Sequence, residues 1–537
     1  MKKIILGCLV VAAVVATSVA FAQATGKPLD YKDPGLFANL ILGFKVALSF
    51  QNLWYCFVGC FLGTLIGVLP GIGPVATIAM LLPITFNLPP TPALIMLAGI
   101  YYGASYGGST TAILVNLPGE SSSVVTCIDG YQMGKNGRAG PALSIAALGS
   151  FFAGCVGTVL IALFGPPLAE LAFEFGAAEY FSMMVLGLVS AVVLASGSLI
   201  KAIAMVLVGL LLGIVGTDVN SGIARYSLGI SELTDGIGFV SVAMGMFGFA
   251  EIISNLEARQ QEIADENIVK VHGLMPSMDD LKRSTGPILR ATALGVIFGI
   301  LPGSHTVIAS FSSYTLEKKL AKNPDRFGKG AIEGVAGPEA ANNAAAQTAF
   351  IPLLTLGIPT GAVMALMVGA MTIQGIAPGP QVMTQKPDLF WGMIASMWIG
   401  NLMLVVLNLP LVGMWVQFLK IPYRLMFPGI CIFIAIGAYS VNNSGFDVYL
   451  AAGFGLFGYF ASKWGCEPAP LLLGFVLGPL MEENLRRAML ISRGDPTIFF
   501  TRPISLGMLV VALFLLAIIV LPVIRKKREE VLTEEGG

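Results

Sequence analysis

Residues that carry most enzyme chemistry are scarce in this sequence. Only two of its 537 residues are histidine, and charged residues make up 12% of the chain, against roughly 25% in ordinary soluble domains. The sequence contains no cluster of metal ligands, no nucleophile paired with histidine and no nucleotide-binding motif. Its 31 acidic and 31 basic residues cancel and form no basic stripe, which argues against a nucleic-acid partner. We therefore expect neither an enzyme nor a nucleic-acid-binding protein, and no cofactor.

Cysteine chemistry is also not expected. Most of the seven cysteines lie in apolar segments, and Cys56 and Cys60, four residues apart, have no histidine or further cysteine nearby. Cysteines in such surroundings are typical of small apolar packing residues. The sequence thus favours neither a zinc site nor a disulfide framework.

Apolar residues dominate instead. They make up 55% of the chain, whose mean hydropathy is +0.82. Many apolar runs approach the roughly 20 residues that a membrane-spanning helix needs. We predict an all-α polytopic membrane protein with about 10–12 transmembrane helices, counted by that length.

The chain divides into five segments. Residues 1–22 resemble a signal peptide or signal anchor, because two lysines, an apolar stretch and an Ala-Phe-Ala pattern follow one another. Residues 23–254 form the first membrane repeat, and 255–285 a charged cytoplasmic loop. Residues 286–524 form the second repeat with terminal helices, and 525–537 a charged tail. The four basic residues that open this tail predict a cytoplasmic C-terminus.

Two short phrases occur twice in the same order. The first pair is Gly67-Val68-Leu69-Pro70-Gly71-Ile72-Gly73 and Gly299-Ile300-Leu301-Pro302-Gly303-Ser304-His305. The second pair is Val115-Asn116-Leu117-Pro118-Gly119-Glu120-Ser121 and Leu356-Gly357-Ile358-Pro359-Thr360-Gly361. Their offsets are 232 and 241 residues. Matching broken apolar segments are typical of transporters whose substrate binds between repeats. Counting helices orients the copies oppositely, so we predict two inverted repeats with re-entrant or broken helices.

The breaks and the polar residues near them are the candidate site. Proline and glycine leave backbone groups unpaired, which a membrane tolerates only in protein or beside a wet cavity. Freed amides attract anions, and carbonyls can hold sodium; the alternative is that the breaks only help packing. The substrate-binding candidates are Gly71, Gly73, Ser109, Thr110, Asn116, Pro118, Gly119, Ser121, Gly303, Ser304, His305, Asn342, Asn343, Thr355, Gly357, Pro359 and Thr360. The sodium candidates are Gly71, Gly303, Asn116 and Gly357.

One alanine-rich stretch holds the best candidates for the coupling ion. Glu339 and Asn343 lie four residues apart, on one face of a predicted helix, with Asn342 adjacent. Small neighbours allow close helix approach, and polar residues inside a membrane are functional by default. Either Glu339 binds a proton or cation, or Pro338-Glu339 begins a helix and the acid faces its own N-terminus. Glu120, Glu339 and Asn343 are the coupling-ion candidates.

Other polar residues have simpler interpretations. Ser121–Ser123 also fits a solvated loop, and Glu482-Glu483 with Arg486-Arg487 fits ion pairing along one helix. Three charged residues near helix ends are most simply interfacial: Asp129, Asp218 and Lys201.

At these phrases the chain resembles the TctA family, the large membrane subunit of bacterial tripartite tricarboxylate transporters. The resemblance covers nearly the whole chain after residue 35. Besides both phrases, its carriers are Tyr106-Gly107-Gly108-Ser109-Thr110-Thr111, Asp129-Gly130-Tyr131-Gln132-Met133, Gly334-Val335-Ala336-Gly337-Pro338-Glu339-Ala340-Ala341-Asn342-Asn343 and Glu483-Asn484-Leu485-Arg486-Arg487-Ala488.

This resemblance implies a secondary carrier of the bacterial inner membrane, driven by a sodium or proton gradient. It implies two partners: a small TctB-like membrane subunit and a TctC-like periplasmic solute-binding protein that delivers carboxylates such as citrate. The chain departs from the family at His305, where a glycine is expected. A histidine there could contact an anionic substrate or make transport sensitive to pH.

The sequence therefore favours an ion-coupled secondary transporter subunit that imports di- or tricarboxylates. The alternative is a channel or exporter component for small anions that does not couple to an ion gradient.

Overall fold

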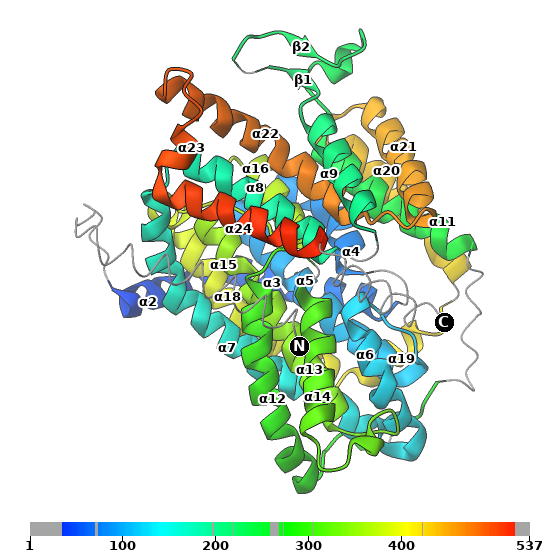
Figure 1. Ribbon diagram of the computed structural model, residues 1–537. Coiled ribbons are helices and arrows are strands. Elements are labelled where there is room, and N and C mark those ends of the chain that lie inside the picture. The colour runs from blue at the N-terminus through cyan, green and yellow to red at the C-terminus, as the bar shows by residue number, and fades with distance from the viewer. Residues whose placement is uncertain are drawn as a thin grey trace.

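The computed structural model describes residues 35–69, 73–195, 198–218, 220–257, 268–271, 273–303, 305–421 and 423–520, and these are almost entirely helical (Figure 1). Within these ranges four stretches are long and apolar enough to cross a membrane: 50–67, 134–173, 239–257 and 387–408. Seven shorter apolar helices accompany them. The expected all-α polytopic fold is confirmed, while the number of spans and the inverted orientation stay predictions. The signal segment, the tail and 258–267 of the charged loop lie outside the described residues.

The elements of the first half are α2 (Leu36–Ala47), α3 (Phe50–Gly67), α4 (Pro74–Leu81), η1 (Leu82–Asn87), α5 (Pro90–Val115), η2 (Ser121–Ser123), α6 (Val124–Thr126), η3 (Cys127–Tyr131), η4 (Gly134–Arg138), α7 (Ala139–Phe173), α8 (Ala177–Leu194), α9 (Leu199–Gly213), η5 (Ser231–Leu233), α10 (Phe239–Ala243), η6 (Met244–Phe249) and α11 (Ala250–Glu257). Two short strands, β1 (Gly216–Thr217) and β2 (Ala224–Arg225), pair antiparallel with Gly216 opposite Arg225.

The elements of the second half are α12 (Met278–Gly299), α13 (His305–Leu320), η8 (Pro324–Arg326), α14 (Glu333–Thr348), α15 (Phe350–Leu356), α16 (Ala362–Ile373), α17 (Gln381–Gln385), α18 (Pro387–Asn408), α19 (Val412–Phe418), α20 (Tyr423–Asn442), α21 (Gly445–Lys463), α22 (Pro468–Ile491), α23 (Ile498–Thr501) and α24 (Pro503–Val520). The helices α12, α13 and α14 pack together at the end of the molecule opposite the β1–β2 hairpin (Figure 1).

Several helices extend beyond their apolar runs. The apolar pattern ends α5 near residue 106, but the helix continues to Val115, and Ser109 and Thr110 donate hydrogen bonds to carbonyls four residues earlier. Helix α12 begins at Met278, inside the expected loop, because Ser277 and Asp280 form a reciprocal capping box. The apolar stretch 350–373 divides into α15 and α16 at Leu356–Gly361, the second copy of the second phrase.

The first half contains a close pair of helices, α3 and α5. A Cβ atom added at Gly63 would lie 2.3 Å from the carbonyl oxygen of Ile100, and one at Gly67 would lie 2.4 Å from that of Ala104. No side chain fits at such distances, so the glycines set how closely the two backbones approach.

The second half repeats this pair in α12 and α14. A Cβ at Gly295 would lie 2.3 Å from the carbonyl oxygen of Ala341, and one at Gly299 would lie 2.4 Å from that of Ala345. The glycines follow those of α3 by 232 residues and the alanines follow their α5 counterparts by 241, the two offsets of the repeated phrases. The duplication is therefore one of helix packing as well as of sequence.

Candidate functional site

The repeated proline phrase interrupts the helices at equivalent residues. Helix α3 ends at Gly67 and α12 ends at Gly299. The following helices begin at Pro74, after Gly73, and at His305. The predicted site residues Gly71 and Ser304 lie outside the described residues.

The second phrase ends a helix in each half with a left-handed residue. Asn116 caps the C-terminus of α5 with φ 58°, and Gly357 caps that of α15 with φ 74°. Such a residue terminates a helix, and glycine or asparagine adopts this conformation most readily. We call Asn116–Glu120 the first tip and Gly357–Gly361 the second tip. Asn116 is exposed and Pro118 half-buried, whereas the second tip is buried throughout.

The two phrases of each half meet. In the second half, the Gly303 amide donates a 2.6 Å hydrogen bond to the Thr360 carbonyl. In the first half, a Cβ on Gly119 would lie 2.4 Å from the Gly67 carbonyl oxygen. The sequence analysis predicted both phrases as site residues, and the structure brings them together within each half.

At the second tip two buried polar atoms have no hydrogen-bond partner among the described residues: Thr360 Oγ1 in the tip itself and Nε2 of His305 beside it. His305 Nδ1 lies 3.0 Å from the Gly303 carbonyl oxygen. Since a carbonyl only accepts, Nδ1 carries the hydrogen and Nε2 is left for another group. The Gly303 carbonyl, a predicted sodium ligand, is engaged by this hydrogen bond.

Helix starts also converge on the second tip. A Cβ added at Gly361, directly before α16, would lie 3.2 Å from both the Gly303 carbonyl oxygen and His305 Cε1. The first turns of α13 and α16 are therefore neighbours, and amides at helix starts favour anions. The hydroxyl of Thr355, another predicted site residue, donates to the Ile351 carbonyl of its own helix at 2.7 Å.

Glu339 connects the two halves. Its side chain is buried, and Ser109 Oγ lies 2.6 Å from its Oε2, while Thr126 Oγ1 contacts its Oε1. Helix α14 begins at Glu333, so Glu339 lies in the second turn. The alternative that Pro338-Glu339 begins the helix is wrong, because the helix starts five residues before Pro338.

A second carboxylate also bridges the halves. Glu120 Oε1 accepts hydrogen bonds from Asn342 Nδ2 at 2.9 Å and Ser122 Oγ at 2.6 Å. Ser122 and Ser123 are buried and only Ser121 is exposed, so the solvated-loop interpretation fits Ser121 alone.

Asn343 supports this region from within α14. Its Nδ2 donates to Ser150 Oγ at 2.7 Å and to the Glu339 carbonyl at 3.1 Å. Both asparagines of the predicted cluster thus contact the first half, Asn342 at the first tip and Asn343 at α7.

A small cavity adjoins Glu339. Its volume is about 10 Å³, enough for a single water molecule. Two polar atoms of its lining residues, Tyr106 Oη and Asn408 Oδ1, have no hydrogen-bond partner in the described part of the chain. The lining residues are Tyr106, Ser109, Thr110, Leu143, Ala146, Ala147, Ser150, Glu339, Asn408 and Leu409. The sequence analysis missed Tyr106, Ser150, Asn408 and Thr126, although a polar residue inside an apolar run signals Ser150 and Asn408.

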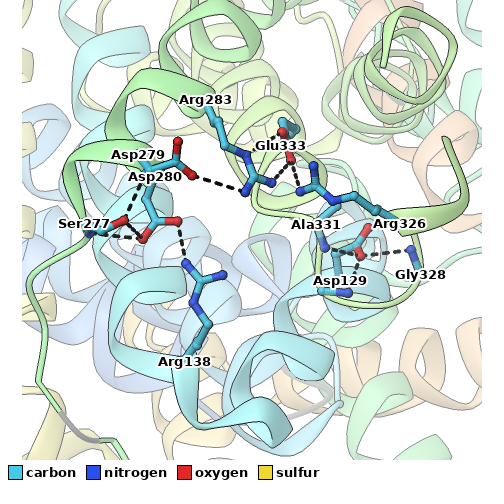
Figure 2. Close-up of polar contacts among 11 residues, drawn as sticks. Asp129, Arg138, Ser277, Asp279, Asp280, Arg283, Arg326, Gly328, Ala331 and Glu333 are labelled. Atoms are coloured by element: carbon cyan, nitrogen blue, oxygen red, sulfur yellow. Dashed lines mark hydrogen bonds and ion pairs between the residues drawn. The ribbon is translucent and has the colours of Figure 1, made fainter. Parts of the chain in front are cut away.

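Asp129 is not interfacial as predicted. It is fully buried, and its Oδ1 accepts backbone hydrogen bonds from Gly328, Gly330 and Ala331 at 2.7–2.9 Å (Figure 2). Its Oδ2 accepts one from Tyr314 Oη at 2.9 Å. The loop before α14 buries this carboxylate, so Asp129 attaches the second half to the first.

Ion pairs surround this attachment. Arg138 pairs with Asp280 at 2.5 Å, and Arg283 and Arg326 both pair with Glu333 (Figure 2). Burial opposes ionisation of Asp280, but hydrogen bonds from Arg138 and Ser277 outweigh it and lower the pKa of that carboxyl.

A further polar cluster attaches the β1–β2 hairpin to α22. Arg486 donates to both oxygens of Asp218, at 3.0 and 2.9 Å, and pairs with Glu482 at 2.6 Å. The predicted pairing along this helix is confirmed, whereas Asp218 is buried by the ion pair rather than simply interfacial.

The chain is similar in sequence to one known family and to two proteins of one organism. A sequence model of the "Tripartite tricarboxylate transporter TctA family" matches residues 53–473. The chain is 61% identical over 500 residues to an Agrobacterium vitis protein described as an "Uncharacterized 52.8 kDa protein in TAR-I ttuC' 3'region", covering 93% of this chain and 99% of that protein. It is 63% identical over 241 residues to "Uncharacterized protein in TAR-II ttuC' 3'region" of the same organism, covering 45% of this chain and 100% of that protein. No solved structure matches.

Proposed function

This chain belongs to the tripartite tricarboxylate transporter TctA family, and we propose that it is the ion-coupled subunit that moves di- or tricarboxylates into the cell. TctA is the large membrane subunit of a transporter, which accords with the scarcity of catalytic residues in the sequence. We propose the bacterial inner membrane as its location, with a cytoplasmic C-terminus.

The observation that carries the substrate class is the chemistry of the second tip. Two helix starts meet there beside His305 Nε2 and Thr360 Oγ1, both buried without a partner among the described residues. Helix-start amides favour anions, the threonine hydroxyl can donate, and a histidine that gains a proton at Nε2 becomes a cationic donor. These groups suit a carboxylate.

Binding of a whole tricarboxylate requires a rearrangement. The cavity beside Glu339 holds about 10 Å³, far less than the roughly 300 Å³ of typical small-molecule pockets. We propose that the conformation described here is closed, and that the tips separate when one unit of the protein moves against the other. A small TctB-like subunit and a TctC-like periplasmic binding protein complete the system, and no cofactor beyond the coupling ion is required.

The test is uptake of radiolabelled citrate and other di- and tricarboxylates into proteoliposomes that contain this chain with both partners. Accumulation above the external concentration, driven by an inward sodium or proton gradient, supports an ion-coupled transporter. Equilibration without accumulation under either gradient supports the alternative, a non-coupled channel or exporter component. Replacing a polar group of the second tip together with the amide that contacts the first tip, by Thr360→Val with Asn342→Leu, should abolish uptake while the protein remains folded.

A further inference from the structure

We propose that Glu339 carries the transported proton, so that the coupling ion is H⁺ and the cavity beside this carboxyl is its access route. This inference rests on the proposed transport function and specifies the ion that drives it.

The hydrogen atoms around Ser109 support a protonated Glu339. Ser109 Oγ lies 2.6 Å from Glu339 Oε2 and 3.1 Å from the Ser105 carbonyl oxygen. A serine hydroxyl has one hydrogen, and both neighbours only accept if the carboxyl is ionised. A protonated Glu339 instead donates to Ser109 Oγ. The Ser109 hydroxyl then donates its own hydrogen bond to the Ser105 carbonyl oxygen. Both contacts are then hydrogen bonds.

Glu120 provides the contrast. Its Oε1 accepts from Asn342 Nδ2 and Ser122 Oγ, and an amide NH₂ always donates. These partners suit an ionised carboxylate. Two neighbouring carboxyls with different surroundings are a common basis for one holding a proton while the other is charged. We therefore place the proton on Glu339 rather than on Glu120.

Burial without a counter-ion supports the same assignment. Glu339 is 1% exposed and forms no ion pair within the described ranges. A buried unpaired carboxylate is costly, and such groups take up a proton instead. The ionisable groups facing it are Tyr106 of α5, Cys127 of η3 and Glu120 before η2. Charged groups on the other packed elements have partners of their own: Arg290 with Glu317, Arg283 with Glu333, and Asp129 with the loop before α14.

The cavity offers a route to this proton. It is lined by Glu339, and Tyr106 Oη and Asn408 Oδ1 on its wall lack a partner in the described structure. A water molecule there would find a phenol, an amide oxygen and the carboxyl as partners, the number that buried waters usually have. Tyr106 and Asn408 are positioning residues in this scheme, and Glu339 alone takes up and releases the proton.

The decisive variant is Glu339→Gln, which copies the shape of the protonated acid but cannot release a proton. It is assayed in proteoliposomes with both partners, beside Glu170→Gln, an exposed acid of α7. In the wild type and the control, an inward proton gradient without sodium should drive accumulation. In Glu339→Gln, accumulation should fall to equality with the outside, while exchange of internal for external carboxylate continues, because exchange needs no net proton release.

Other results separate the two proposals. No gradient-driven accumulation by the wild type overturns the transport function and with it this inference. Accumulation by the wild type that requires sodium, or proton-driven accumulation that survives in Glu339→Gln, leaves the function standing and overturns the proton assignment.

A spectroscopic readout covers the case in which the glutamine variant does not fold. The purified wild type should show an infrared carbonyl band of a protonated carboxyl that is lost as the pH is raised. In Glu339→Asp, which keeps a carboxyl on a shorter side chain, that band should shift in frequency. A band unchanged by this substitution would assign the proton to another residue.

Discussion

The two tips share a backbone and differ in chemistry. By the 241-residue offset, Glu120 of the first tip corresponds to Gly361 of the second, and by the 232-residue offset Gly73 corresponds to His305. The first tip therefore holds an acid, and an imidazole lies beside the second, at places where the other copy has glycine. The first tip is also partly exposed, whereas the second is buried. The two halves thus share a similar backbone frame but place different ionisable groups in it.

Helix α5 of the first half and helices α14 and α15 of the second also carry different side chains at equivalent positions. The offset relates Ser109 to Phe350 and Asn342 to Tyr101. Ser109 contacts Glu339 in a polar network, whereas the rings of Tyr101 and Phe350 lie with their centroids 6.4 Å apart. Ser109 and Asn342 thus each hydrogen-bond to an acid, whereas their counterparts Phe350 and Tyr101 contact each other as rings, so the site is asymmetric although its frame is repeated.

The largest effect is expected where the two halves are most alike. Gly67→Val and Gly299→Val each force a side chain into a carbonyl oxygen 2.4 Å from the added Cβ. Overpacking costs about 1–3 kcal/mol when neighbouring side chains can move aside. Here the added side chain meets backbone atoms, which move least, so we expect both variants to lose most of their folded protein. Yield of monodisperse protein and melting temperature in detergent measure this, with Gly453→Val, whose Cβ has open space, as control. If only one of the two variants lost folded protein, the close approach of the two helices would be required in that half and not in the other.

The next effect concerns a contact that only one half can make. Asp129→Ala leaves three backbone amides and the Tyr314 hydroxyl without their acceptor. A buried donor left unsatisfied costs about 1–3 kcal/mol, and the Ala331 amide is buried while the other donors are partly so, so the melting temperature should drop. Proteolysis should then begin within 327–331. Asp325→Ala in the same loop, at an exposed position, should change neither; equal behaviour of the two variants would refute the attachment.

A smaller effect should distinguish the second tip from the first. His305→Gly restores the residue of the first copy and removes a group that must gain a proton at Nε2 before it can donate to a carboxylate. The affinity of the wild type for carboxylate should therefore weaken as the pH rises. In the variant it should be lower and less dependent on pH, with a loss of roughly tenfold for one charge-assisted hydrogen bond. The KM of carboxylate exchange across pH measures this, and a KM that still follows pH as in the wild type would exclude His305.

The smallest effect is expected outside both tips. Hydrogen bonds from Arg486 lower the pKa of Asp218 to about 2. A lowered pKa means that the ion pair stabilises the fold at neutral pH and that this contribution fades as the pH falls from about 4 toward 2. Arg486→Gln should therefore lower the melting temperature slightly at pH 6 but not near pH 2. Uptake should be retained. Arg487→Gln, which removes a half-exposed pair with Glu483, is the matched control; identical pH profiles would contradict the assignment.

Local signals account for what the sequence predicted. The glycines and prolines of the repeated phrases end helices by themselves: Pro-Gly in the first pair, and Asn-x-Pro or Gly-x-Pro in the second. Both pairs of interruptions, and the membrane class, could therefore be predicted. The continuation of α5 through Ser109 and Thr110 could not be predicted. Their hydroxyls donate to carbonyls of the same helix, which the sequence does not reveal. The contact of Ser109 with Glu339 joins residues 230 positions apart, and no local pattern encodes such a pairing.

The same reason explains the missed residues. In the sequence, Asp129 looks interfacial because the residues next to it in the chain do not bury it. The loop around Gly330, 201 residues later, buries it instead. The lining of the cavity by Tyr106 and Asn408 depends on how α5 and α18 pack, which a single sequence without a known fold does not determine.

The loop that donates hydrogen bonds to Asp129 lies in an interval that is longer in the second half than in the first. From Gly67 to Asn116 the first half advances 49 residues, and from Gly299 to Gly357 the second advances 58. Within this longer interval lie the 16-residue α13, against 8 residues in α4, and the segment with Gly328 and Gly330. An assembly of two identical first halves would offer Asp129 no such segment to bind. The attachment that Asp129 makes thus depends on residues in the longer interval of the second half, so the two halves are joined asymmetrically although their helix packing is repeated.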